Sequence, residues 1–347
     1  MSIKYNGGYI PAVGADGTTL VANSASATGV AWAGPSVAAG KNICINGGFD
    51  IWQRGTSFTT FVYTADRWKM NPGGTVTVSQ DTDVPTGVGV RYSLKQLTSA
   101  SSSYSQYQMG FEQATTIPMR NQVYTFSFYM KANATWSNTF NPQIYYSNAS
   151  DTLSTIMSGT LVTATGNTAP TPTTSWVRYA VTFTVPSDAV GIGVYFAPVA
   201  VQASGAALWI AGCQWEIGSV ATAFSRAGGT LQGELAACQR YYERKTTAAY
   251  GLYGLSYANT GNLYVLMPFE VQKRVTPTAM DTSAVGTFYW ENGVATGNTA
   301  TSVSLGGSCT ADVGQLQLVK AASFTAGTPY GVFSYTAGGY VGFSAEL

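Results

Sequence analysis

Apolar and polar side chains alternate along several stretches of the chain, and this pattern restricts the fold more than any other feature. In residues 123–130, every second side chain is a tyrosine, phenylalanine or methionine. Residues 177–185 and 192–196 alternate in the same way, and shorter strand patterns occur at 263–267 and 315–319. A period of two indicates strands with one buried face and one wet face. Because turns rich in Gly, Asn, Ser and Pro separate these strands, we predict an all-β fold with an antiparallel jelly-roll sandwich.

One segment departs from this pattern. Residues 230–245 place apolar side chains at helical spacing. Thr230 can cap the start, and Arg244 with Lys245 suits the carboxyl end. We therefore expect one connecting helix between two β domains. The predicted parts are an amino-terminal segment at 1–40, the jelly roll at 41–227, the connector helix at 228–245 and a smaller β-rich carboxyl-terminal domain at 246–347.

Charged residues are scarce, which limits the partners of the chain. They make up 10% of the sequence, against roughly 25% in typical soluble domains, and the net charge is +1. No Lys/Arg cluster stands out, so a basic nucleic-acid site is not expected. No apolar run reaches the roughly 20 residues of a membrane span, and the first residues lack the apolar core of a signal peptide.

Histidine is absent from all 347 residues. This excludes Ser-His-Asp and Cys-His nucleophile pairs and every His-ligated metal site within the chain. Glycoside hydrolysis would need two carboxylates flanking the scissile bond. The 16 acidic residues are scattered, so we expect no catalytic residues, no cofactor and no enzymatic activity. Isolated examples are Asp66, Glu112, Asp151, Glu216 and Glu270.

Six stretches occur in an order that resembles a known group of proteins. They are residues 42–55, 63–68, 208–224, 234–242, 267–278 and 341–347. The first three are similar to the opening and closing strands of carbohydrate-binding-module-like jelly rolls in tailed-bacteriophage fibre and head-fibre proteins. The fourth is similar to the connector that follows this jelly roll, and the last two resemble the carboxyl-terminal domain. The resemblance covers residues 42–347.

The resemblance implies a structural virion protein, either a tail fibre or a head fibre, that attaches to host-surface glycan. It also implies a homotrimer that contacts other virion proteins. Residues 1–40 have too few large apolar side chains for a core of their own, and we expect them to attach the chain to the virion. Such a protein is made in the host cytoplasm without a signal peptide. Two alternatives remain: an architectural capsid-decoration or adaptor protein without a ligand, and a glycan-degrading enzyme.

The resembling jelly rolls sometimes hold a structural calcium ion, for which Asp50 is the candidate ligand here. The closing strand has Ala211 and Gly212 where a second aspartate would stand. Calcium takes six to eight oxygen ligands, so we expect no metal. The alternative for Asp50 is that it caps a turn or pairs with Arg54.

The four cysteines show no Cys-x-x-Cys spacing. They are Cys44, Cys213, Cys238 and Cys309. Free cysteine packs as a small apolar residue, so we predict four buried free thiols. The alternative is a Cys44–Cys213 disulfide.

Aromatic residues supply the candidate ligand site. The chain has 8 Trp and 22 Tyr, and flat aromatic rings can stack on sugar rings while neighbouring Ser, Asn and Gln bond the hydroxyls. We predict glycan binding by exposed aromatics of the jelly roll, because binding side chains usually sit on loops above a rigid scaffold. The alternative is packing, since buried cores and subunit contacts also use Tyr and Trp. The candidates are Tyr104, Tyr107, Trp136, Tyr145 and Tyr146.

Overall fold

The computed structural model describes residues 41–101, 104–198, 200–292, 300–320 and 324–347. Outside these ranges it gives only the backbone of β1 (Lys4–Tyr5), β2 (Gly8–Tyr9), β3 (Thr19–Ala22), β4 (Val30–Ala33) and β23 (Thr296–Asn298). The attachment segment predicted for residues 1–40 therefore lies outside the described residues.

The chain divides into two compact units, and each contains a piece from elsewhere in the sequence. The first unit comprises Met1–Asp50, Thr56–Glu234 and Leu347. The second comprises Ile51–Gly55 and Leu235–Glu346. Five residues near the amino-terminal end of the jelly roll thus belong with the carboxyl-terminal unit.

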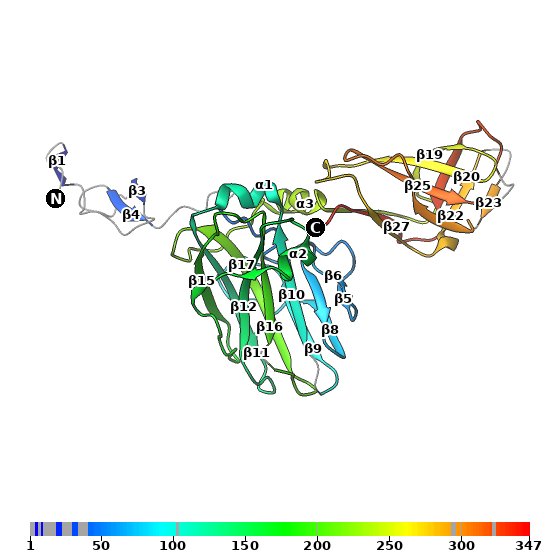
Figure 1. Cartoon of the computed structure of the whole chain (residues 1–347). Coiled ribbons are helices and arrows are strands. Elements are labelled where there is room, and N and C mark those ends of the chain that lie inside the picture. The colour runs from blue at the N-terminus through cyan, green and yellow to red at the C-terminus, as the bar shows by residue number, and fades with distance from the viewer. Residues whose placement is uncertain are drawn as a thin grey trace. The chain divides into compact units, whose positions relative to one another are not determined.

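Two antiparallel sheets build the first unit (Figure 1). The six-stranded sheet runs, in order, β13 (Thr160–Leu161), β12 (Phe140–Ser147), β16 (Gly191–Pro198), β10 (Ser105–Phe111), β7 (Lys69–Pro72) and β6 (Val62–Tyr63). The seven-stranded sheet runs β14 (Ala164–Gly166), β15 (Val177–Thr184), β11 (Val123–Ala132), β17 (Ala207–Ile217), β9 (Ser93–Thr98), β8 (Val76–Asp81) and β5 (Ser57–Phe58). Short helical turns are α1 (Gln113–Thr116), η1 (Ile117–Met119) and α2 (Leu153–Met157).

Aromatic side chains fill the space between these two sheets. Phe126 of β11 lies 5.5 Å from Phe196 of β16 and 5.6 Å from Trp215 of β17, measured between ring centroids. Trp68 and Trp215 are fully buried, whereas Trp52 is half-buried. Packing of inner faces around such a core defines a sandwich, which confirms the predicted all-β antiparallel fold.

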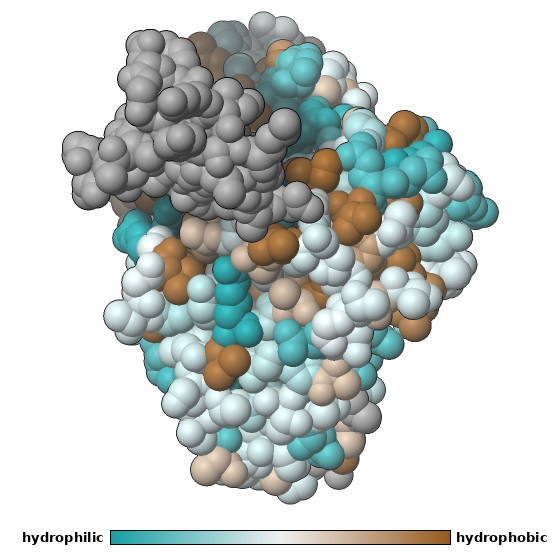
Figure 2. All heavy atoms as spheres, turned by 90° about the vertical axis from the view of Figure 1, so that its left-hand side faces the viewer, coloured by the Kyte–Doolittle hydropathy of each residue, from teal (hydrophilic) through white to brown (hydrophobic). Residues whose placement is uncertain are grey.

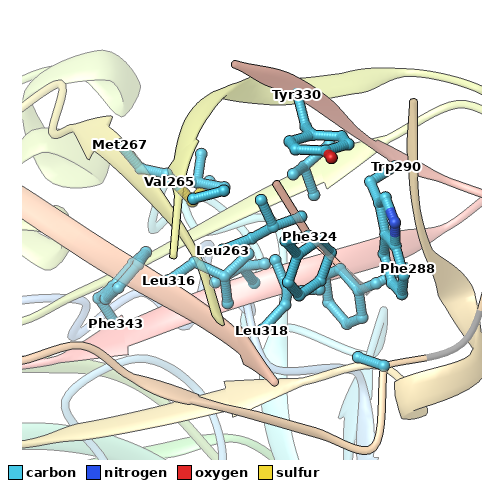
Figure 3. Close-up of a cluster of buried hydrophobic side chains, with 14 residues drawn as sticks. Leu263, Val265, Met267, Phe288, Trp290, Leu316, Leu318, Phe324, Tyr330 and Phe343 are labelled. Carbon is cyan, nitrogen blue, oxygen red and sulfur yellow. The ribbon is translucent and has the colours of Figure 1, made fainter. Parts of the chain in front are cut away.

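The second unit contains two further antiparallel sheets. The small sheet has the order β18 (Tyr242–Thr247), β27 (Gly339–Ser344) and β21 (Ala279–Thr282). The large sheet has the order β23, β22 (Phe288–Glu291), β26 (Tyr330–Ser334), β19 (Leu252–Ala258), β20 (Asn262–Pro268), β25 (Val313–Val319) and β24 (Ser302–Leu305). A 3-10 turn, η2, covers Val285–Thr287. Figure 3 shows the core, in which Leu263, Val265, Leu316 and Leu318 meet Phe288 and Trp290.

The predicted helix exists but is shorter than expected. It is α3 (Leu231–Gln239), and the N–H of Gly233 donates to Thr230 Oγ1 at 3.0 Å, which confirms the cap. The extension to Lys245 is wrong, because Tyr242–Thr247 pairs with β27 as strand β18. Strand pairing satisfies the backbone there and buries the side chains of Tyr242 and Glu243.

The surface matches the low charge of the sequence. On the face shown in Figure 2, pale residues of intermediate hydropathy predominate, and the brown patches are separated by pale or teal residues. In the part of the chain that the structure describes, no helix combines the length and apolar composition needed to cross a membrane.

Candidate functional site

The outer face of the six-stranded sheet carries a group of tyrosine and amide side chains. Strand alternation places them there. In β10, Tyr107 and Met109 are buried in the core, so Gln106 and Gln108 lie on the outer face, where Gln106 is half-buried and Gln108 is only 9% exposed. In β16, the burial of Val194 and Phe196 leaves Tyr195 on the outside by the same rule. In β12, the same alternation turns Asn141, Gln143 and Tyr145 outward.

Strand register brings these side chains into neighbouring positions. Gln108 stands opposite Lys69 on one side and opposite Tyr195 on the other, and Tyr195 stands opposite Gln143. Opposed residues of an antiparallel pair lie about 4.5–5.5 Å apart at Cβ. A continuous row therefore crosses four strands. We call the whole group the platform: Lys69, Asn71, Tyr104, Gln106, Gln108, Asn141, Gln143, Tyr145 and Tyr195.

Two tyrosines meet at the centre of the platform, and a third, Tyr104, lies beside Gly73 at its end. The rings of Tyr145 and Tyr195 are 6.0 Å apart and nearly perpendicular, at 84°. Burial, together with the nearby phenols of Tyr104 and Tyr145, raises the pKa of Tyr195 to about 12. Tyr104 lies against Gly73, where an added Cβ would meet its ring at 2.4 Å. The glycine thus lets the Tyr104 ring lie directly on the backbone.

The remaining platform side chains are mostly amides, which can both donate and accept hydrogen bonds. Asn71 Nδ2 donates to Gln106 Oε1 at 2.9 Å, which orients both groups. Lys69 is the only charged side chain of the platform, and its ammonium lies 4.3 Å from the centre of the Phe61 ring. The platform contains no carboxylate.

The short helix α2 covers the part of this sheet face that lies beside the platform. Glycines make room for it: a Cβ at Gly110 would lie 3.1 Å from both Ile156 and Leu153, and a Cβ at Gly193 would lie 2.7 Å from Met157. In Figure 1, α2 lies over the ends of β10 and β16. The open part of the face is therefore confined to the platform.

A hollow of about 410 Å³ adjoins the platform at the edge of β12. The short strand β13 pairs with one end of this edge, at Tyr145 and Tyr146. Two further bonds follow along the edge, where Val162 N donates to Ile144 O at 2.8 Å and Phe140 N donates to Pro170 O at 2.9 Å. Between them lies Pro142, which has no N–H to leave unpaired at an edge. Asn141 is one of the residues that line the hollow. Its Oδ1 is buried without a hydrogen-bond partner. A donor from a ligand would relieve the cost of that buried acceptor.

Two of the five predicted aromatics lie on the platform, namely Tyr104 and Tyr145. Tyr146 is half-buried and stands opposite Ile192, a core residue, so it points away from the platform. The prediction grouped Tyr145 with Tyr146, but adjacent strand residues face opposite sides of a sheet.

The exposure predicted for Tyr107 and Trp136 is wrong. Tyr107 is 1% exposed and donates its hydroxyl to Gln96 Oε1 at 2.9 Å. Trp136 is 9% exposed, packs edge-on against Phe140, and donates its indole N–H to Asn138 O at 3.2 Å. Both are core residues whose polar atoms are satisfied inside the protein, as buried Tyr and Trp require.

Sequence reasoning missed most of the platform, including Tyr195, Gln143 and Asn71. The period-two pattern held a usable signal for one of them. Once Ile192, Val194 and Phe196 are assigned to the core, Tyr195 must face outward. Its nearness to Tyr145 was not visible in the sequence, because it depends on which strands pair.

Asp50, the candidate calcium ligand, forms an ion pair with an arginine side chain of this chain. Arg226 Nε lies 2.8 Å from Asp50 Oδ2, so the partner is not Arg54, which pairs with Glu346 at 3.4 Å. The nearby carboxylate of Glu234 accepts from the backbone N–H groups of Asn46 and Gly228. A guanidinium at the carboxylate does not fit calcium binding. Among the described residues no cluster of three or more acidic or cysteine side chains could hold a metal ion.

All four cysteines are free thiols. Cys44, Cys213 and Cys238 are buried, as predicted, and Cys309 is half-buried. Burial raises the pKa of the Cys44 and Cys213 thiols well above the ordinary value. The buried cysteines act as small apolar core residues.

Comparison with known proteins gives one family match. Residues 41–200 match the family described as carbohydrate binding domain, which supports carbohydrate binding by this part of the chain. No curated protein matches the chain.

Several solved structures share low similarity with the chain. The enzymatically active domain of bacteriophage CBA120 tailspike protein 4 matches at 16% identity and a TM-score of 0.35, over 51% of this chain and 21% of that chain. The CBM22-1 xylan-binding domain from Paenibacillus barcinonensis Xyn10C matches at 16% identity and a TM-score of 0.32, over 48% and 94%. The C-terminal family 22 carbohydrate binding module of Clostridium thermocellum Xyn10B matches at 17% identity and a TM-score of 0.31, over 46% and 91%. The chain thus spans about a fifth of the tailspike structure.

Proposed function

We propose that this chain is a structural virion protein, a tail fibre or head fibre, that attaches to host-surface glycan through the platform. One observation carries the glycan part: three tyrosines and five amide side chains share the open half of one sheet face, inside the region that matches a carbohydrate binding domain. The virion part rests on the ordered sequence resemblance to phage fibre proteins.

The chemistry of the platform suits a glycan. Tyr104, Tyr145 and Tyr195 offer flat apolar rings with polar edges, and such side chains lose little rotamer entropy on binding. Amides beside them can pair with hydroxyl groups as both donors and acceptors. A single shallow site of this kind binds with a dissociation constant on the order of millimolar, about −4 kcal/mol. Several copies in a homotrimer would raise the avidity by roughly 10²–10⁴.

We propose binding without catalysis. A glycosidase places two carboxyl groups about 5–10 Å apart around the scissile bond, and the platform holds none. The acidic side chain Glu216, an isolated carboxylate in the sequence, is buried and engaged by Lys41 at 3.0 Å. A glycan-degrading protein would release product from host polysaccharide, and we expect no release.

The glycan site can be tested in the full chain with Tyr195→Ala and a triple variant that also replaces Tyr104 and Tyr145. The matched control is Tyr129→Ala, a half-buried tyrosine of β11 in the other sheet. We expect the platform variants to lose binding to host cells and to a glycan array, with the control unchanged. Equal binding by all variants would place the ligand elsewhere. Absence of binding by the wild-type protein would favour the architectural alternative.

The virion role has a separate test. Deletion of residues 1–40 should leave a folded protein that no longer joins particles. An antibody label on intact particles, seen at low resolution, would distinguish a head from a tail position. Normal incorporation of the truncated protein would contradict an amino-terminal anchor.

A further inference from the structure

The large sheet of the second unit has an apolar outer face as well as an apolar inner face. Its inner face forms the core in Figure 3. On the outer face, Leu255 is 72% exposed, and five other large side chains are about half exposed or more. A sheet with only one covered face normally carries polar side chains on the other. We call this group the outer patch: Tyr250, Leu252, Leu255, Tyr257, Leu266 and Tyr335.

The outer patch has the layout of a protein interface. Most of its side chains belong to or adjoin β26, β19 and β20, and β19 is the central strand of the seven. Polar side chains lie on the flanking strands β25 and β24, where Gln317 and Ser304 stand opposite each other. An apolar centre with a polar rim is typical of buried protein contacts. Stacking of Tyr257 on Tyr264, at 5.0 Å and 21°, holds part of the centre in place.

Charge narrows the choice of partner. Among the described side chains of this face, Glu291 is the only charged one, and it accepts a hydrogen bond from Tyr289 at 2.6 Å. A charged partner would lose hydration here without gaining a counter-charge. The partner must therefore present a surface that is also neutral and apolar. The outer patch of a second copy of this chain has these properties.

The exposed area of the outer patch is also sufficient for a stable interface. Large aromatic side chains bury about 150–250 Å² each when fully covered. The six side chains of the outer patch are about half exposed or more, and Tyr264, Tyr289 and Phe333 beside them are less exposed. Together they offer on the order of 600–800 Å². Each partner contributes about that area to a standard stable interface.

We propose that the outer patch is the surface through which copies of this chain associate with one another. Leu255 lies at its centre, on the central strand, and is its most exposed member. The proposal does not depend on glycan binding, and its failure would leave the platform untouched.

The test uses the full chain and light scattering coupled to size exclusion at about 10 µM. We expect the wild type to elute as a multiple of the chain mass. Leu255→Arg should weaken association at least tenfold. Val220→Arg should not, because Val220 is 60% exposed but belongs to the first unit. A monomeric wild type, or an assembly unchanged by Leu255→Arg, would overturn the proposal.

A second measurement avoids substitutions altogether. Hydroxyl-radical labelling of the wild type, at dilute and assembled concentrations, should show protection of Tyr257 and Tyr335 on assembly. Tyr129 of the first unit should label equally in both. Unchanged labelling of the outer patch in the assembled protein would show that another surface is used. If the wild type is monomeric and binds neutral lipid vesicles, the outer patch contacts lipid and not another copy, and the proposal is overturned.

Discussion

The ring of Tyr145 meets the ring of Tyr195 edge to face, with 6.0 Å between their centres. The two residues are far apart in the sequence and belong to paired strands, β12 and β16. Their contact fixes the centre of the platform. It also means that the two rings cannot be regarded as independent ligand contacts.

Ring stacking and hydroxyl bonding at Tyr195 can be separated. Tyr195→Phe keeps the ring, whereas Tyr195→Ala removes it. If stacking supplies most of the affinity, Ala should lower host-cell binding at least tenfold, about 1.4 kcal/mol, and Phe should change it by less than about threefold, or roughly 0.7 kcal/mol. Binding isotherms of the assembled variants measure both. Equal losses for Phe and Ala would assign the affinity to the hydroxyl group.

The Tyr195 phenol should remain neutral well above the pH at which an ordinary tyrosine ionises. Burial, assisted by the Tyr104 and Tyr145 phenols, raises its pKa to about 12, against about 10 for an unperturbed tyrosine. The acid form therefore persists through pH 10 to 11. Difference absorbance between the wild type and Tyr195→Phe should show one phenol titrating near pH 12. A difference spectrum that titrates near pH 10 would contradict the burial of this group.

Substitution of Tyr107 should destabilise the fold rather than alter a ligand site directly. Tyr107→Ala removes a buried ring, which costs about 3–5 kcal/mol for large aromatic residues. Tyr107→Phe leaves Gln96 Oε1 without the 2.9 Å hydrogen bond, at a cost of about 1–3 kcal/mol. Denaturant midpoints give both values. If both variants were as stable as the wild type, Tyr107 would have to be exposed and could again be a ligand contact.

Glu216 should make the first unit sensitive to acid. Burial by itself raises the Glu216 pKa, but hydrogen bonds from Thr222, Gln214 and Lys41 outweigh it, and the net pKa is lowered. A carboxylate with a lowered folded-state pKa stabilises the fold above its unfolded pKa of about 4.3, and that contribution is lost as the pH falls through the folded-state value.

Glu216→Gln should accordingly lower the free energy of unfolding at pH 7 by about 1–3 kcal/mol. It should also flatten the fall in stability between pH 5 and pH 3. Urea melts at each pH measure this, and Glu270→Gln is the control because the Glu270 side chain is 73% exposed. An equally steep acid profile in Glu216→Gln would rule out this carboxylate as the cause.

The second unit contains an ion pair that is buried at both ends. Lys273 Nζ lies 2.6 Å from Glu243 Oε2, with side-chain exposures of 0% and 2%. Lys273→Met leaves the buried carboxylate with only the more distant Lys245, whose Nζ lies 3.9 Å from Glu243 Oε1. Removing one partner of a buried pair costs about 3–5 kcal/mol, and we expect a loss toward the lower end of that range. The double variant with Glu243→Gln removes the charge and keeps an acceptor for the Glu270 N–H, so we expect it to recover part of that loss. A double variant as unstable as the sum of the singles would show no coupling.

Local patterns predicted the strands well, because a half-buried strand must alternate whatever it pairs with. The alternation at 123–130, 177–185 and 192–196 became β11, β15 and β16. The same alternation places Tyr107 with Met109 on the core face of β10. The predicted helix is too long because Tyr242 also fits the apolar spacing of a helix. Only the pairing with β27 shows that Tyr242 belongs to a strand.

The platform itself could not be predicted in full. Lys69, Gln108, Tyr195 and Gln143 become neighbours through three strand pairings between distant segments. Which strands pair, and in which order, is a property of the whole sandwich. The hollow beside Pro142 likewise depends on where residues 161–170 leave the edge of β12.

The membership of Ile51–Gly55 in the second unit has a consequence for synthesis on the ribosome. This pentapeptide emerges early, but the groups it bonds, such as the Tyr242 carbonyl that accepts from Gln53 Nε2 at 2.8 Å, are made much later. The jelly roll can collapse around its own core while this short loop is still without its partners. The nascent chain is then exposed at that loop to proteases and chaperones until the downstream sheets have formed.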